Sequence, residues 1–128
     1  MNLSVGSPML EACLLAVLSR GDAYGYGLTQ ELTAHLGTSE STLYPVLRRL
    51  QKEGCLSVYD QPFQGRNRRY YTLTDVGAQR LKEYQEAWSD YRKKVEDLLL
   101  TDGKEGPDDQ APIFEHLRLL PRRKTSGA

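Results

Sequence analysis

The sequence is short of cysteine and histidine, and each shortage excludes a class of site. It has two cysteines and two histidines in 128 residues. Cys13 and Cys55 lie in apolar segments without the spacing of metal ligands, so we expect reduced core residues and neither a disulfide nor a zinc site. His35 and His116 have no neighbouring ligands, and no serine has a histidine-based relay. The sequence therefore predicts no metal, no cofactor, no catalytic residue and no enzymatic activity.

Long apolar runs are missing as well. No stretch approaches the roughly 20 apolar residues needed to span a bilayer. The apolar run over residues 9–18 contains Glu11 and lacks the basic start and the cleavage site of a signal peptide. We therefore expect a cytoplasmic protein with no membrane association. The length, with 39% hydrophobic and 27% charged residues, fits one globular domain with a modest core.

The chain has no excess of charge of one sign, because 17 basic and 17 acidic residues cancel. The charges are nevertheless unevenly placed along the chain. Residues 38–72 carry six basic and three acidic side chains, so this part is positive and the remainder is negative. A local basic patch is what binding to nucleic acid requires, whatever the average charge of the protein.

Apolar residues recur at helical spacing in three segments of the first half. The pattern predicts a helix over residues 8–19, a second over 25–35, and a third that starts near 39–41 and ends at Gly54. The period then changes from 3.6 to 2. This change predicts two strands, over 56–59 and 69–73, joined by a long polar hairpin loop over residues 60–68.

A last helix over residues 75–100 has the most regular pattern in the chain. Its apolar residues follow an alternating spacing of three and four, which is the a/d stripe of a coiled coil. Such a helix is about 39 Å long, longer than a domain of this size is wide, so part of the stripe needs a partner. The predicted dimer interface consists of Leu81, Tyr84, Trp88, Tyr91, Val95 and Leu98.

The composition changes after residue 100 to Asp, Gly, Pro and Lys. We interpret residues 101–128 as a flexible tail in which residues 113–120 are apolar enough for a short helix. The expected organisation is a DNA-binding domain over 1–74, a dimerisation helix over 75–100, and this tail.

Three helices followed by a two-stranded hairpin with a basic tip is the order of a winged helix-turn-helix, a mostly α, α+β fold. In such a domain the N-terminal residues of the third helix contact base edges in the major groove, and the hairpin, or wing, reaches a neighbouring groove or the backbone. The third helix begins with hydroxyl side chains and continues with three cations, and the wing tip gathers three more. The predicted DNA-binding residues are Ser41, Thr42, Tyr44, Pro45, Arg48, Arg49, Lys52, Arg66, Asn67, Arg68 and Arg69.

Several of these segments occur together, in the same order, in a known family. The segments GDAYGYGL (21–28), STLYPVLRRL (41–50), EGCL (53–56) and GRNRRYYTLT (65–74) resemble the PadR family of bacterial transcriptional regulators. The resemblance covers roughly residues 8–100 and leaves the tail uncovered. It points to the short, s2-like members, which lack a larger C-terminal domain.

The resemblance implies a homodimeric repressor whose last helix, with the first, forms the dimer interface. We expect the homodimer to bind double-stranded operator DNA with an inverted repeat. In some short members an aromatic residue on the last helix accepts a flat aromatic compound between the subunits, and Trp88 stands at that place. The implied ligand-binding residues are Trp88, Arg92, Ala12 and Tyr84. Drug-sensing members carry an acid where this chain has Arg92 and a second tryptophan where it has Asp60, which argues against cationic ligands.

Each of these assignments has a simpler alternative. Trp88 on an apolar stripe packs an interface even if no ligand binds there. The cations of the third helix, taken alone, are equally typical of a solvated helix face. The alternative for the whole protein is a winged-helix module that binds another protein instead of an operator.

Overall fold

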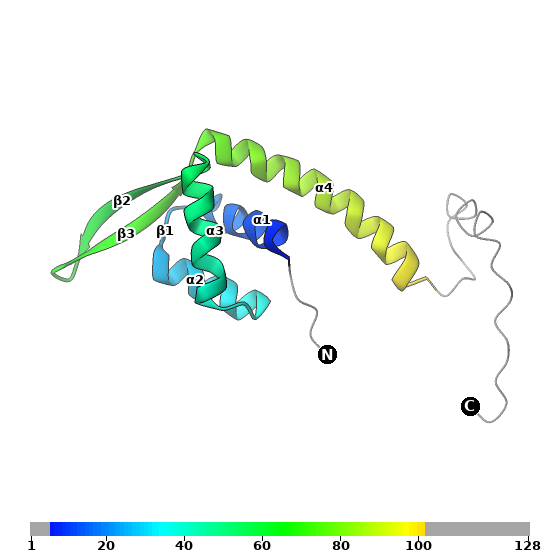
Figure 1. Cartoon of the computed structure of the whole chain (residues 1–128), viewed down its shortest axis with the longest axis horizontal. Coiled ribbons are helices and arrows are strands. Elements are labelled where there is room, and N and C mark those ends of the chain that lie inside the picture. The colour runs from blue at the N-terminus through cyan, green and yellow to red at the C-terminus, as the bar shows by residue number, and fades with distance from the viewer. Residues whose placement is uncertain (1–5, 102–128) are drawn as a thin grey trace, which may run out of the picture. The chain divides into compact units, whose positions relative to one another are not determined.

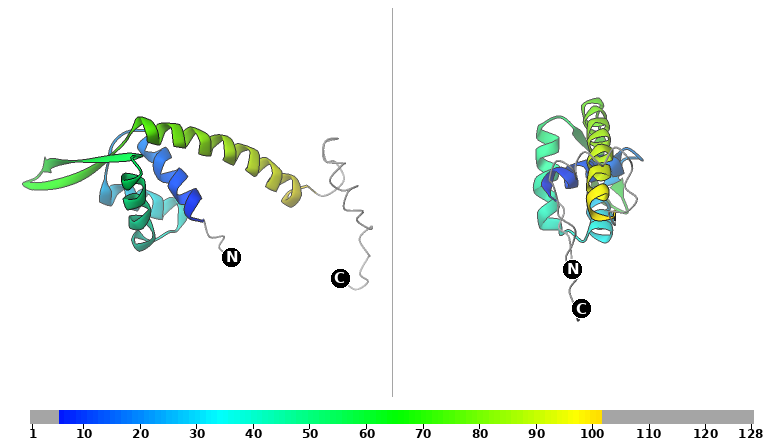
Figure 2. Two further views of the ribbon diagram at one scale, coloured as in Figure 1. Left: turned by 45° about the horizontal axis from the view of Figure 1, so that its top comes forward. Right: turned by 90° about the vertical axis from the view of Figure 1, so that its right-hand side faces the viewer.

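The computed structural model describes residues 6–101 and shows a mostly helical fold with one small antiparallel sheet (Figures 1 and 2). Two compact units are distinguished, one that runs to Ala87 and one from Trp88 onward. The fold class predicted from the sequence is confirmed. The elements in chain order are α1 (Ser7–Leu18), β1 (Ala23–Tyr24), α2 (Gly25–Leu36), α3 (Glu40–Lys52), β2 (Leu56–Phe63), β3 (Arg66–Leu73) and α4 (Asp75–Leu99).

The helices begin and end close to the residues that the sequence predicts, because local signals set their ends. Ser39 precedes α3, and its hydroxyl oxygen accepts a hydrogen bond from the backbone N–H of Thr42 at 3.3 Å. Pro45 lies inside α3, past its first turn, so its missing N–H leaves the Ser41 carbonyl without its partner in the helical hydrogen-bond pattern. Gly37 ends α2 with a φ of 69°, a left-handed conformation that suits glycine.

The core lies where α1, α2 and α3 pack together, and it is built mostly of leucine. The apolar spacing predicts most of these positions, but in α1 Leu15 is fully buried where Cys13 and Val17 are only half-buried. The sheet and α4 add one core residue each, Leu56 and Leu81. Burial of a leucine contributes about 1.5–3 kcal/mol, so this cluster accounts for most of the stabilisation of the first unit. The fully buried side chains include Leu14, Leu15, Leu28, Leu43, Leu47, Leu50 and Cys55.

The wing is longer and more regular than the sequence predicts. Its strands run to Phe63 and start again at Arg66, so most of the segment that we expected to be a loop is paired sheet. Only Gln64 and Gly65 form the turn, with φ values of 50° and 78°. A two-residue turn with positive φ at both positions matches the twist of a hairpin. Strand pairing therefore continues almost to the tip of the hairpin, although residues 60–68 are mostly polar.

A third strand, β1, was not predicted. It pairs with β3 through Ala23 and Tyr24 and gives the strand order β1-β3-β2. Because β1 directly precedes α2, this pairing attaches the start of α2 to the wing strand β3 (Figure 1). Two residues are too few to show a period in the sequence, so only the pairing reveals this strand.

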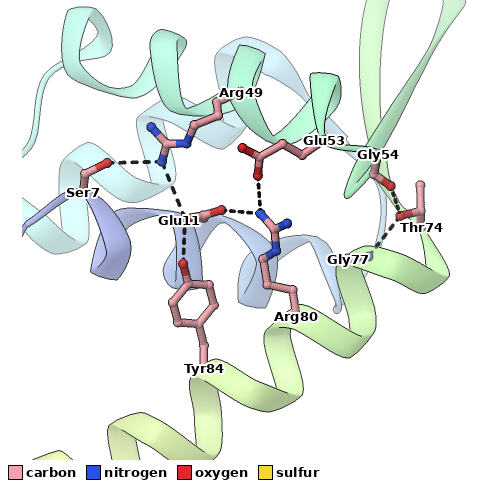
Figure 3. Close-up of polar contacts among 9 residues, drawn as sticks. All are labelled: Ser7, Glu11, Arg49, Glu53, Gly54, Thr74, Gly77, Arg80 and Tyr84. Atoms are coloured by element: carbon pink, nitrogen blue, oxygen red, sulfur yellow. Dashed lines mark hydrogen bonds and ion pairs between the residues drawn. The ribbon is translucent and has the colours of Figure 1, made fainter.

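The first turn of α4 is attached closely to the end of α3 (Figure 3). The Thr74 hydroxyl donates to the Gly54 carbonyl at 2.6 Å and accepts from the Gly77 backbone N–H at 3.0 Å. A Cβ atom placed on Gly77 would lie 2.2 Å from the Cys55 carbonyl oxygen. Glycine is therefore required at this position by the close approach of the two backbones.

Within residues 6–101, no helix has the length and apolar character to cross a membrane. Cys55 is buried, Cys13 is half-buried, and both are free thiols. The predicted short helix over residues 113–120, and nearly all of the predicted tail, lie outside the described residues.

Candidate nucleic-acid interface

The exposed face of α3 carries the polar residues predicted to contact DNA. Ser41, Thr42 and Pro45, in its first turns, are exposed. The Ser39 hydroxyl lies 3.0 Å from that of Ser41 and 2.9 Å from that of Thr42, so three hydroxyl groups gather where α3 begins. Hydroxyl groups at a helix N-terminus, beside its free amide groups, can bind phosphate oxygens or base edges.

Tyr44 is placed differently from its hydroxyl-bearing neighbours. It is half-buried and packs against the apolar core, whereas Thr42 and Pro45 are exposed. Its ring therefore contributes to stability as well as to any contact with DNA. The sequence predicts the DNA contact of Tyr44 but not this packing role.

The three cations of α3 do not share one environment. Arg48 and Lys52 are exposed, and neither forms an ion pair with the described part of the chain. Arg49 instead extends to α1, where its guanidinium donates to the Ser7 hydroxyl at 3.2 Å and lies 3.5 Å from the Glu11 carboxylate. The structure thus separates Arg49 from the two cations that are free to contact phosphate.

The wing also separates its cations. Arg66 and Asn67 are exposed at the tip, and Arg69 is exposed with its Nε atom 3.7 Å from an Asp60 carboxylate oxygen. Arg68 is half-buried on the same face of the ribbon as Arg66. Its guanidinium therefore has less access to phosphate than that of Arg66.

The sheet face that carries Arg68 is lined by aromatic rings, which the sequence does not predict. The rings of Tyr59 and Tyr70 stack at 5.5 Å between centroids, and that of Tyr24 lies 6.2 Å from that of Tyr70. The Tyr59 hydroxyl donates to the Asp22 carboxylate at 2.7 Å. Hydrogen bonds from Thr72 and Tyr59 lower the pKa of Asp22. Pairing of β1 with β3 brings these residues together, and no signal in the sequence indicates it.

A buried carboxylate connects α1, α3 and α4 (Figure 3). Glu11 on α1 accepts from the Arg80 guanidinium at 2.8 Å and from the Tyr84 hydroxyl at 2.6 Å, both on α4. Arg80 also donates to Glu53, the residue that follows α3. Burial raises the pKa of Glu11, but hydrogen bonds from Tyr84 and Arg80 and the charges of Arg49 and Arg80 outweigh it, and the pKa is lowered.

The apolar stripe of α4 divides into a buried and an exposed part. Leu81 is only 6% exposed and belongs to the core, and Tyr84 is half-buried against that core. Trp88, Tyr91 and Leu98 are 45%, 60% and 63% exposed, and Val95 is half-buried. The structure therefore uses the first two members of the predicted interface within the monomer and leaves the later apolar side chains available.

The residues predicted to bind a ligand fall in both units. Tyr84 lines a hollow of about 610 Å³, with Glu11, Arg49 and Arg80 among its other walls. Ala12 is half-buried on α1 and is not one of the wall residues. Arg92, in the second unit, lies 3.7 Å from Glu96 one turn later. That pairing partly neutralises the cation that was expected to select anionic compounds.

Comparison with known proteins supplies an independent line of evidence. Residues 14–83 match the profile of a family described as "Transcriptional regulator PadR-like family". The transcriptional regulator Rv3488 of Mycobacterium tuberculosis is 37% identical over 75 residues, which cover 58% of this chain and 70% of that protein.

Solved structures match the fold over most of the chain. The structure of smu.1704 from Streptococcus mutans is 38% identical with a TM-score of 0.74, over 84% of this chain and 100% of that one. A PadR-like transcriptional regulator from Bacillus cereus, BC4206, is 34% identical with a TM-score of 0.68, over 73% of this chain and 94% of that one. The order of elements found here is therefore shared with these proteins.

Proposed function

The chain belongs to the PadR-like family of transcriptional regulators, and we propose that it represses transcription as a homodimer bound to operator DNA. The observation that carries the proposal is the exposed face of α3, where hydroxyl groups at the N-terminus are followed by Arg48 and Lys52, two cations without an ion-pair partner among residues 6–101. In a helix-turn-helix domain this end of the helix enters the major groove. Arg66 and Asn67, exposed at the wing tip, would contact the flanking backbone or groove.

The exposed part of the α4 stripe supports the homodimer. Three apolar side chains of this stripe, Trp88, Tyr91 and Leu98, remain exposed. A second copy would cover them with the same residues, because a two-fold interface joins a surface to itself. Two-fold symmetry would place two recognition helices about 34–36 Å apart, so the operator is expected to be an inverted repeat.

Trp88 is the proposed site for a regulatory ligand. Its indole ring offers a flat surface at the proposed seam, on which a planar aromatic compound can stack. A compound that binds one arrangement of the dimer more tightly than another would shift the spacing of the recognition helices and release the operator. Arg92, which Glu96 neutralises only in part, favours neutral or anionic compounds over cationic ones.

The deciding experiment is a genomic pull-down with the full chain, followed by footprinting of the recovered DNA. We expect an inverted repeat in a promoter, protected over two neighbouring turns. Binding to that site should weaken linearly with salt on a log–log scale, because phosphate contacts release counterions. Recovery of no specific DNA, with binding that is insensitive to salt, would favour the alternative of a protein-interaction module.

A further inference from the structure

We propose that Glu11 determines the specificity of DNA binding: it withholds Arg49 from the phosphate backbone and fixes the recognition helix to α4 (Figure 3). The inference rests on the proposed function, since it assigns a role within the same DNA interface. Glu11 itself lies on α1 and is 6% exposed, so it does not contact DNA directly. It acts as a positioning residue for Arg49 and α3.

The two oxygens of Glu11 are fully engaged. One accepts from Arg80 at 2.8 Å, and the other accepts from Tyr84 at 2.6 Å and lies 3.5 Å from Arg49. A carboxylate in an apolar helix face is costly unless it is paired and hydrogen-bonded, and here three partners provide that compensation. The group is thus held in one place by residues from two other helices.

Arg49 is held on α1 by two partners. Besides the Glu11 carboxylate, the Ser7 hydroxyl accepts a hydrogen bond from the same guanidinium nitrogen. The Arg49 side chain remains 42% exposed, so water reaches it, but a phosphate would have to compete with a carboxylate already in place. Arg48, the preceding residue on the same helix, is exposed and has no such competitor among the described residues.

Arg80 on α4 links α1 to the C-terminal end of α3. Its guanidinium donates to Glu11 on α1 and to Glu53, directly after α3. A rotation of α3 relative to the start of α4 would break one of these pairs or the contact of Arg49. The orientation of α3 is therefore fixed relative to the first turns of α4.

Removing the charge of Glu11 should have two separable effects. Arg49 loses its carboxylate partner and becomes free to neutralise a phosphate, which strengthens binding to any duplex. The recognition helix loses part of its attachment to α4, which weakens binding to the operator. Both effects lower the ratio of specific to non-specific affinity, which is the quantity that matters for a regulator.

The test measures binding of the full chain by fluorescence anisotropy, to the footprinted operator and to a random duplex of equal length, over a salt series. The salt slope is taken as the steepness with which log affinity falls with log salt concentration. Arg48→Ala should make this slope shallower by about one per protomer on both DNAs, and Arg49→Ala should leave both slopes unchanged. Glu11→Gln should raise the slope on random DNA by about one per protomer and lower the specificity ratio by about ten-fold. In the double variant Glu11→Gln, Arg49→Ala the slope should return to that of the wild type.

The outcomes separate the two proposals. If Arg49→Ala lowers the slope as much as Arg48→Ala does, Arg49 is a phosphate contact and the inference is overturned. An unchanged slope and ratio for folded Glu11→Gln overturn it as well. If Glu11→Gln does not fold, the comparison of Arg49→Ala with Arg48→Ala decides alone, because Arg49→Ala leaves Arg80 and Tyr84 on the carboxylate. A wild-type protein without salt-dependent binding to any duplex overturns the inference together with the proposed function.

Discussion

The guanidinium carbon of Arg68 lies 3.6 Å from the centre of the Phe63 ring, across the two strands of the wing. The same carbon lies 4.2 Å from the centre of the Tyr24 ring, so the cation rests between two aromatic faces. Contacts of this kind attract the cation to the ring and, at partly exposed sites, contribute about 0.5–1 kcal/mol each. Arg68 therefore joins the wing to β1, whereas Arg66 at the tip has no comparable contact with the described residues.

This difference predicts that replacing Arg66 changes DNA binding, whereas replacing Arg68 mainly changes stability. Arg66→Ala should lower the salt slope of DNA binding by about one per protomer and leave stability unchanged. Arg68→Ala should instead lower the free energy of unfolding by about 1 kcal/mol, with a smaller effect on the slope. Urea unfolding and salt-dependent anisotropy measure the two quantities. Equal slope changes in both variants would show that Arg68 leaves its aromatic contacts to bind phosphate.

Tyr44 should have two roles that two substitutions can separate. Tyr44→Phe keeps the ring in the core and should retain stability, yet weaken operator binding about five-fold through loss of a hydrogen bond worth about 1 kcal/mol. Tyr44→Ala should also lower the free energy of unfolding by about 2 kcal/mol, because the half-buried ring is lost. Normal operator binding by Tyr44→Phe would mean that the hydroxyl does not reach DNA.

Gly77 and Gly27 form a matched pair for testing the junction of α3 and α4. A Cβ on Gly77 would lie 2.2 Å from the Cys55 carbonyl oxygen and 2.7 Å from a Leu73 methyl carbon. We expect Gly77→Ala to destabilise the fold by about 3 kcal/mol. On Gly27 in α2 the new methyl meets only ordinary contact, so Gly27→Ala should stabilise by about 0.5–1 kcal/mol. Thermal unfolding of both variants measures this, and a neutral Gly77→Ala would contradict the close approach.

Tyr84 should make stability sensitive to alkaline pH. Burial and the hydrogen bond to Glu11 raise the pKa of Tyr84 to about 12. The pKa of an unfolded tyrosine is about 10, so the phenol stabilises the fold below pH 10 and loses this contribution as the pH rises towards about 12. The difference in unfolding free energy between wild type and Tyr84→Phe should therefore be largest near pH 8 and shrink above pH 10.

The exposed Tyr26 provides the control for that experiment, because Tyr26→Phe removes a phenol that is 54% in solvent. Urea unfolding of the three proteins at a series of pH values gives the comparison. A constant difference between wild type and Tyr84→Phe from pH 8 to about pH 11.5 would show that neither burial nor the hydrogen bond to Glu11 raises the pKa of Tyr84.

Trp88 is the only tryptophan, so its fluorescence reports on the proposed ligand site without labelling. Planar aromatic compounds that release the operator should quench it in the same concentration range. Trp88→Phe should keep a weakened operator response, and Trp88→Ala should lose it, while sedimentation shows an intact dimer for both. If releasing compounds leave the fluorescence unchanged, Trp88 has only a packing role.

Much of the fold follows from the sequence because its signals are local. Helix ends marked by Ser39 and Gly37, and the apolar spacing within each helix, need only neighbouring residues to be recognised. The wing and β1 depend on pairing between distant residues, such as Tyr24 with Tyr70. Composition therefore led us to expect a loop where the strands continue to Phe63 and Arg66.

In the candidate site, too, the sequence does not show which distant side chains contact each other. The sequence marks Arg48 and Arg49 as equivalent cations on one helix. Whether each is free depends on Glu11, which is 38 residues before Arg49 and, in the sequence, only interrupts an apolar run. Side-chain partners that are brought together by tertiary packing leave no periodic trace, so the sequence predicted the helix but not which of its cations are available.

The burial of Leu81 determines where the chain can be cut or fused. Leu81 lies beyond the wing in sequence, yet it fills the same core as α1 and α3, and a buried leucine contributes about 1.5–3 kcal/mol. A fragment that stops at Leu73 would lack Leu81 from the core, and Glu11 would lose its hydrogen bonds from Arg80 and Tyr84. A fragment that continues to Ala87 retains all of them. Chimaeras that transplant this winged-helix unit onto another helix should therefore place the splice after Ala87.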